Sequence, residues 1–143
     1  MKVIYRGGLN GPPLFYFWVR TQELRKKQNP KAKAFALAAA KVAAERHCTD
    51  IVVLDLRGIS PATDYFVIAT GTSNRQMRSV ADEINAAARE QGMQRFGRAG
   101  YEQARWILLD YVDIVIHLFD TEYRNYYDLE LLWGDAKRLK IDE

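Results

Sequence analysis

The chain has 143 residues, of which 48% are apolar and 12% aromatic. It is therefore long enough for one domain with a hydrophobic core and too apolar for an intrinsically disordered protein. No apolar stretch of the sequence reaches the roughly 20 residues that a membrane-spanning helix needs. The single cysteine, Cys48, excludes an internal disulfide and a cysteine-rich zinc site, and a cytosol-like reducing compartment is the simple interpretation.

The net charge of +3 is unevenly distributed along the chain. Residues 1–33 contain eight Lys and Arg and one Glu, whereas residues 34–143 contain thirteen basic and seventeen acidic residues, a net charge of −4. Three glycines and two prolines between residues 7 and 13 interrupt any regular element. We therefore predict a basic, flexible arm at residues 1–29, or an organelle transit peptide, ahead of one domain at residues 30–143. An acidic domain suits a basic protein partner better than sequence-independent binding of nucleic acid.

The elements are predicted in chain order from apolar periodicity and end signals. A helix is expected from Pro30 to about His47, with Asn29 as its N-cap, followed by buried strands at Ile51–Leu56 and Asp64–Thr70. Ser73 and Gln76 form a capping-box pattern that begins a second amphipathic helix, which ends near Gly92.

The second half of the chain predicts a weak strand at residues 94–97 and a hairpin of strands Arg105–Asp110 and Asp113–Phe119. A last helix at Glu122–Trp133 and a short charged tail follow. This order of elements indicates an α/β fold, a mixed-sheet sandwich with helices on its faces.

Three motifs in order resemble one family, the ribosomal silencing factors, also called RsfS or Iojap. They are DYFVIATGTSNRQ at residues 64–76, RWILLD-x-x-D-IVIHLF at 105–119 and YYDLELLWGDA at 126–136. The resemblance implies a nucleotidyltransferase-like fold that acts by binding, without catalysis or cofactor. It also implies docking on ribosomal protein fourteen of the large subunit, which blocks joining of the small subunit and represses translation in the cytoplasm. Organellar members of the family support large-subunit assembly in the mitochondrion or chloroplast.

The chain departs from the family pattern at Val112, where the family usually has glycine. A β-branched residue resists positive φ, so we expect a different turn between the two strands of the hairpin.

Two features could serve phosphoryl-transfer chemistry, and each also has a structural interpretation. Asp110 and Asp113 could hold a divalent cation for a small nucleotidyltransferase, but no Asp-x-Asp occurs in the sequence, and aspartate is common at turns. Gly71-Thr72-Ser73 before a helix could cradle a phosphate, but no Walker lysine accompanies it. We favour structural roles and partner contact for both, with Ser73 and Arg75 touching the partner.

The remaining candidates are partner-binding residues in the hairpin and last helix. His117 lies in an apolar strand without a neighbouring nucleophile, which favours a core or interface role over catalysis. Trp106 is either a core residue or an exposed anchor, and the family resemblance favours the anchor. Tyr127 and Leu131 form a second apolar stripe beside the core-facing Tyr123, Tyr126, Leu129 and Trp133. That second stripe indicates a docking surface, a homodimer contact, or a face covered by the arm.

Overall fold

The computed structural model describes Pro13, Tyr16 and residues 29–141. Its elements in chain order are α2 (Ala32–Glu45), β1 (Thr49–Asp55), β2 (Tyr65–Thr70), α3 (Asn74–Glu90), β3 (Gly97–Ala99), β4 (Trp106–Asp110), β5 (Ile114–Phe119), α4 (Thr121–Tyr127), α5 (Leu129–Leu132) and β6 (Lys137–Leu139). The strands form one sheet in the order β3-β4-β5-β2-β1-β6, in which β2 and β5 are parallel and the other neighbours are antiparallel.

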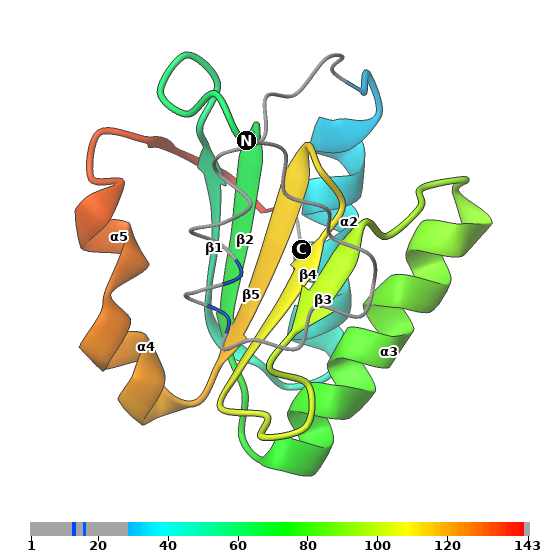
Figure 1. Cartoon of the computed structure of the whole chain (residues 1–143), viewed down its shortest axis with the longest axis vertical. Coiled ribbons are helices and arrows are strands. Elements are labelled where there is room, and N and C mark those ends of the chain that lie inside the picture. Colours follow the sequence, from blue (N-terminus) through cyan, green and yellow to red (C-terminus); the bar gives the residue numbers. More distant parts are fainter. Residues whose placement is uncertain (1–12, 14–15, 17–28, 142–143) are drawn as a thin grey trace.

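Helices cover both faces of this sheet, as Figure 1 shows. One core lies between the sheet and α2 with α3, and a second, more aromatic core lies on the face that carries α4 and α5. Every residue of the central strands β2 and β5 is buried because both of their faces are covered. The predicted α/β fold with a mixed sheet is confirmed; its likeness to nucleotidyltransferases stays a prediction.

Helix α3 forms as its sequence predicts. The Ser73 hydroxyl accepts a hydrogen bond from the Gln76 amide at 3.0 Å, and the Gln76 side chain accepts one from the Thr72 amide at 2.9 Å. The helix buries Met77 and its periodic neighbours, and Gly92 stops it with a φ of +73°.

The predicted start of α2 and the predicted third strand are displaced by a few residues. The helix begins at Ala32 because Pro30 and Lys31 form a turn before it, and the Asn29 side chain accepts a hydrogen bond from the Lys31 amide at 2.8 Å. The weak strand occupies Gly97–Ala99 and pairs with β4.

The last helix is broken, contrary to the sequence prediction. Asp128 adopts the left-handed conformation, with φ +44° and ψ +60°, and separates α4 from α5. Within α4, the packed face is formed by Tyr123, Arg124 and Tyr127. Tyr126, expected in the core, lies off this face and is 79% exposed. The predicted charged tail instead contains strand β6, which pairs with β1.

The hairpin turn also corrects an expectation. Val112 does adopt a positive φ, +72°, between a Tyr111 carbonyl and an Asp113 amide that are hydrogen-bonded at 2.9 Å. A three-residue turn closed in this way is strained. The Asp110 carboxylate compensates by accepting a hydrogen bond from the Val112 amide at 2.8 Å.

Within the described part of the chain, none of the helices has the length and apolar character to cross a bilayer.

Candidate functional site

The aromatic core beneath α4 is built around a buried pair of side chains from adjacent strands. The Trp106 indole of β4 donates a hydrogen bond to Nδ1 of His117 in β5 at 3.1 Å. His117 is fully buried, and burial lowers its pKa to about 3. The imidazole is therefore neutral near pH 7.

Trp106 is a core residue in this structure, which corrects the expectation of an exposed anchor. It is 2% exposed, it stacks on Phe119 with ring centroids 4.8 Å apart, and the Tyr127 ring lies 4.7 Å away. Tyr127, expected on a separate surface stripe, is half-buried because it covers Trp106. A partner that docks on this face therefore meets Tyr127 before it meets Trp106.

Asp110 is fully buried at the end of β4, where its carboxylate binds the turn backbone and one residue of the arm. One carboxylate oxygen accepts from the Val112 amide, and the other accepts from the Tyr16 hydroxyl at 3.1 Å. Tyr16 itself is 1% exposed and belongs to the aromatic core. Thus one residue of the predicted arm packs on the hairpin.

Asp113 is buried beside the same turn and holds the start of the domain. Its carboxylate accepts a hydrogen bond from the Asn29 amide at 2.5 Å, and its backbone carbonyl accepts from the Asp64 and Tyr65 amides. Among the described residues, no group of three or more His, Cys, Asp or Glu side chains is placed to hold a metal ion. The observed contacts of both aspartates fit the structural interpretation.

Ser73 and Arg75 are exposed at the start of α3. The Gly71 amide donates to the Phe119 carbonyl at 2.8 Å and the Thr72 amide donates to Gln76, so these donors are already used. The first of these bonds joins the carboxyl ends of the parallel strands β2 and β5. It places the loop before α3 next to the start of α4.

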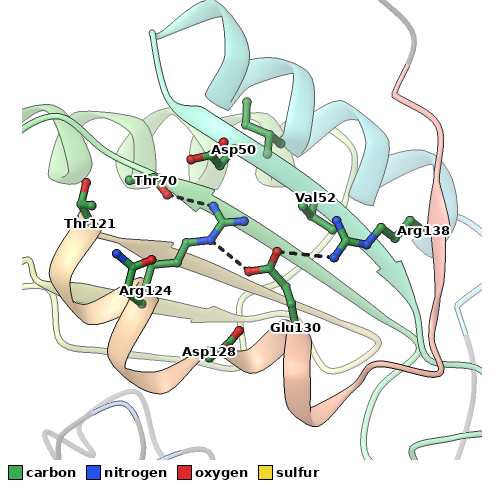
Figure 2. A pocket seen from close by; sticks show the side chains of 10 residues that line it. Asp50, Val52, Thr70, Thr121, Arg124, Asp128, Glu130 and Arg138 are labelled. Atoms are coloured by element: carbon green, nitrogen blue, oxygen red, sulfur yellow. Dashed lines mark hydrogen bonds and ion pairs between the residues drawn. The ribbon is translucent and has the colours of Figure 1, made fainter.

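A pocket of about 530 Å³ lies between α4, α5 and the edge of β1. Figure 2 shows Arg124 reaching from α4 between Thr70 and Glu130. Its guanidinium donates to the Thr70 hydroxyl at 2.9 Å and to the Glu130 carboxylate at 3.1 Å, while Arg138 of β6 lies 3.7 Å from the same carboxylate. This cluster attaches both short helices to the sheet.

The backbone around this pocket is irregular on two sides. Asp50, in the irregular stretch of β1 between Thr49 and Val52, has a φ of +48°, and Asp128 has a φ of +44°. Both carboxylates line the pocket with Glu130, against the guanidiniums of Arg124 and Arg138. The lining has a net charge of −1, which suits a basic side chain of a partner.

The outer surface of α4 and α5 carries large apolar side chains. Tyr126, Leu131 and Leu132 are 79%, 76% and 72% exposed. Elsewhere in the described chain, Ile59 and Phe96 are the other large apolar residues in this class, at 43% and 37%. The most exposed apolar residues thus lie together on two short consecutive helices, a composition that is typical of a protein interface.

Comparison with known proteins assigns the chain to a family. Residues 29–143 match the family model described as "Ribosomal silencing factor during starvation". The chain belongs to this family. The resemblance of its three motifs to the silencing factors is therefore confirmed.

Curated relatives in the silencing-factor family come from bacteria and from plant organelles. The chain is 41% identical over 110 residues to the ribosomal silencing factor RsfS of Bacillus subtilis, which covers 77% of this chain and 93% of the relative. It is 31% identical over 143 residues to protein Iojap, chloroplastic, of Zea mays, which covers 98% of this chain and 57% of the relative.

Solved structures of similar proteins share the fold. A crystal structure from Bacillus halodurans has a TM-score of 0.64 and 36% identity, covering 78% of this chain and 99% of that one. An X-ray structure from Chromobacterium violaceum has a TM-score of 0.67 and 28% identity, covering 82% and 94%.

The structure of this silencing-factor domain sorts the sequence-predicted residues into two groups. Trp106, Asp110, Asp113 and His117 are buried together around the hairpin, whereas Tyr127, Leu131, Ser73 and Arg75 reach the surface to differing extents. Sequence reasoning missed Arg124, Glu130 and the exposed Leu132. An arginine six residues before a glutamate gives no helical signal, since the pair meets only because Asp128 breaks the helix.

Proposed function

We propose that this protein silences translation by binding the large ribosomal subunit through ribosomal protein fourteen, which blocks joining of the small subunit. The observation that carries the proposal is the exposed apolar surface of Tyr126, Leu131 and Leu132 on α4 and α5, hereafter the α4–α5 surface. Membership of the silencing-factor family supports the choice of a ribosomal partner.

The chemistry of the surroundings suits a basic ribosomal protein. Apolar anchors supply most of the binding energy of an interface, and charges at the rim select the partner and speed the encounter. The pocket beside the α4–α5 surface supplies that rim through Asp50 and Asp128, since Glu130 is already paired with Arg124 and Arg138. Ser73 and Arg75 extend the contact along the end of β2 and β5.

The buried candidate residues act by positioning in this proposal. Trp106 and His117 form the floor on which Tyr127 rests, and Asp110 and Asp113 fix the hairpin. The site works as a preformed binding surface and performs no chemical step, which makes the protein a binding factor rather than an enzyme.

The deciding experiment is sedimentation of the purified protein with purified large and small subunits. We expect association with large subunits and a lower yield of joined ribosomes. Leu131→Ala/Leu132→Ala should weaken association by about tenfold or more while leaving the thermal unfolding temperature nearly unchanged, because both side chains are exposed. Ile59→Ala, an exposed apolar residue outside this surface, is the matched control. Equal association with small subunits, or a double variant that binds like the control, would contradict the proposal.

Two further aspects belong to the same proposal. The α4–α5 surface also suits contact between two copies of the chain, and sedimentation of the free protein over a concentration series tests whether the double variant abolishes a homodimer.

The expected compartment is the cytoplasm. The match that extends along 98% of this chain to a chloroplastic relative favours a second candidate, an organellar factor for large-subunit assembly. A fluorescent fusion of the full chain separates the two.

A further inference from the structure

Three arginines gather at the opposite side of the domain, where α3 ends and β3 begins. Arg89 and Arg95, with Asn85, line two adjoining pockets of about 430 and 270 Å³, and Arg98 lines the smaller one. Arg89 comes from the last turn of α3, Arg95 from the following loop and Arg98 from β3. Arg95 and Arg98 are half-buried, so their side chains are partly held in place by the fold.

These guanidiniums have no carboxylate partner among the described residues. The ion pairs of the described chain involve other arginines, namely Arg46, Arg57, Arg105, Arg124 and Arg138. The acidic residue that lines the smaller pocket is Asp82, and both of its oxygens accept hydrogen bonds from the Tyr101 hydroxyl, at 3.1 and 2.9 Å. The cluster is therefore a local excess of positive charge on a domain with a net negative charge.

The neighbouring groups add donors and rigidity. The Asn85 side-chain oxygen accepts a hydrogen bond from the Tyr111 hydroxyl at 3.0 Å. Its NH₂ group is therefore the part that can donate to a ligand in the pockets. The Arg98 guanidinium lies over the Tyr101 ring, 3.9 Å from its centroid. A site made of guanidiniums and an amide NH₂ recognises an acceptor-rich anion.

The guanidiniums of the cluster repel one another. Burial lowers the pKa of Arg95, and the charges of Arg98 and Arg89 lower it further, while Tyr111 and Asp82 raise it. An anion in the pockets would relieve this repulsion. Arg89 alone suits the negative end of a helix, but that role does not account for Arg95 and Arg98 beside it.

We infer that Arg89, Arg95, Arg98 and Asn85, hereafter the arginine patch, bind phosphate groups of an RNA backbone. Arginine forks match phosphate oxygens in bidentate geometry, and backbone contacts of this kind do not depend on sequence. Two adjoining pockets suit successive phosphates of one strand.

A nucleic acid fits the surroundings better than a membrane does. Insertion into a bilayer needs several exposed apolar side chains, and none of the large exposed apolar residues of the described chain lines either pocket. Figure 1 places α3 and β3 on the side of the molecule opposite α4 and α5, so the arginine patch and the α4–α5 surface can be occupied together.

The test is fluorescence anisotropy of the full chain with a labelled oligouridine of about 20 nucleotides, titrated at salt concentrations from about 50 to about 200 mM. Arg89→Gln/Arg95→Gln/Arg98→Gln should weaken binding by about tenfold or more. The slope of log affinity against log salt should become shallower by about 2, since each phosphate contact on a single strand contributes about 0.7. Lys33→Gln/Lys41→Gln/Lys140→Gln removes the same charge at exposed positions outside the patch and controls for net charge.

The patch is an RNA contact only if the two triple variants differ in both affinity and salt slope. Equal losses in the two variants, or no loss in either, would overturn the inference. If the triple variant unfolds, the single variant Arg89→Gln replaces it, because Arg89 is the exposed residue of the patch. It should weaken RNA binding about threefold. Polyglutamate and phosphatidylserine vesicles are the competing probes. Binding of either one that depends on the patch and exceeds RNA binding would reassign the patch to an acidic protein or a membrane.

Discussion

At the scale of single residues, the neutral imidazole of His117 is the most consequential group in the aromatic core. It accepts the Trp106 indole hydrogen bond, and its ring lies 4.5 Å from Phe66. Protonation would place a charge among apolar rings and would remove the acceptor at Nδ1. The folded state therefore favours the neutral form of His117.

This gives a pH prediction with a definite sign. The folded pKa is about 3 and the unfolded value about 6.5, so the unfolded chain binds more protons and stability falls as pH decreases below about 6.5. Between about pH 6.5 and about pH 5, His117 should cost the wild type about 1.5 kcal/mol of unfolding free energy. Denaturant unfolding at several pH values measures this. The dependence should disappear in His117→Gln and persist in His47→Asn, which changes an exposed histidine.

Truncation of Trp106 should damage folding. Trp106→Ala leaves a large cavity under Tyr127 and should lower the free energy of unfolding by about 3–5 kcal/mol, whereas Trp106→Phe loses the hydrogen bond and part of the packing and should cost less. Tyr126→Ala, at a 79% exposed ring, is the control and should change stability by less than about 0.5 kcal/mol. A Trp106→Ala variant that melts at the wild-type temperature but binds large subunits weakly would return Trp106 to the role of an interface anchor.

At the scale of elements, the hairpin turn stores backbone strain. Val112 is a β-branched residue at a φ of +72°, a conformation that costs an L-residue about 1–2 kcal/mol. The turn persists because Asp110 and Tyr111 bind its backbone on both sides. Strain that the surrounding contacts maintain often marks a functional position.

Val112→Gly should relieve that strain and raise the free energy of unfolding by up to about 1 kcal/mol, after the entropy cost of glycine in the unfolded chain. Val112→Ala keeps a Cβ and should give no such gain. Thermal unfolding of the two variants compares them directly. If alanine stabilises as much as glycine, side-chain crowding rather than backbone conformation is the source of the strain.

The short helices α4 and α5 depend on the Arg124 cluster rather than on their own length. Arg124→Lys keeps the charge but cannot reach Thr70 and Glu130 with one planar group, so it should lower the free energy of unfolding by about 1–3 kcal/mol. Arg105→Lys at a half-exposed pair with Asp120 and Glu122 should change it by less than about 1 kcal/mol. Similar costs at both sites, measured by denaturant unfolding, would show that Arg124 is no anchor.

At the scale of the whole molecule, the arm and the domain meet at Tyr16. A Cβ at Gly97 would overlap the Tyr16 hydroxyl, and one at Gly100 would overlap the Pro13 ring and the Trp106 carbonyl. The edge of the sheet is therefore shaped to receive these two arm residues. The division into an arm at residues 1–29 and a domain at residues 30–143 stays a prediction, because most of the arm lies outside the described residues.

Tyr16→Phe should lower the free energy of unfolding by about 1–2 kcal/mol, since it removes a buried hydrogen bond to the Asp110 carboxylate, and Tyr16→Ala should cost more. A chain that starts at Pro30 should be less stable yet still bind large subunits, because the α4–α5 surface does not include the arm. Unchanged stability in Tyr16→Ala would show that the arm does not pack on the domain in solution. Loss of large-subunit binding by a folded, shortened chain would make the arm a ribosome contact.

The sequence by itself determined most of the elements up to β5 and the family. The capping pattern at Ser73, the stop at Gly92 and the continuous apolar strands are local signals, because they depend on residues within a few positions of each other. Three ordered motifs were enough to identify the silencing factors. The same local reasoning left both a covered and an exposed face open for β4 and favoured an exposed Trp106, because it could not say which residues cover that strand.

The tertiary structure decided which candidates reach the surface. Trp106 is buried because Tyr127 and Phe119, both distant from it in the chain, pack against its ring. Tyr126 is exposed because α4 packs on the core through its other face. The arginine patch forms because the end of α3 and the edge strand β3 meet in space. Burial and charge clustering depend on neighbours that the chain brings together only when it folds, and the spacing of residues along the sequence does not contain them.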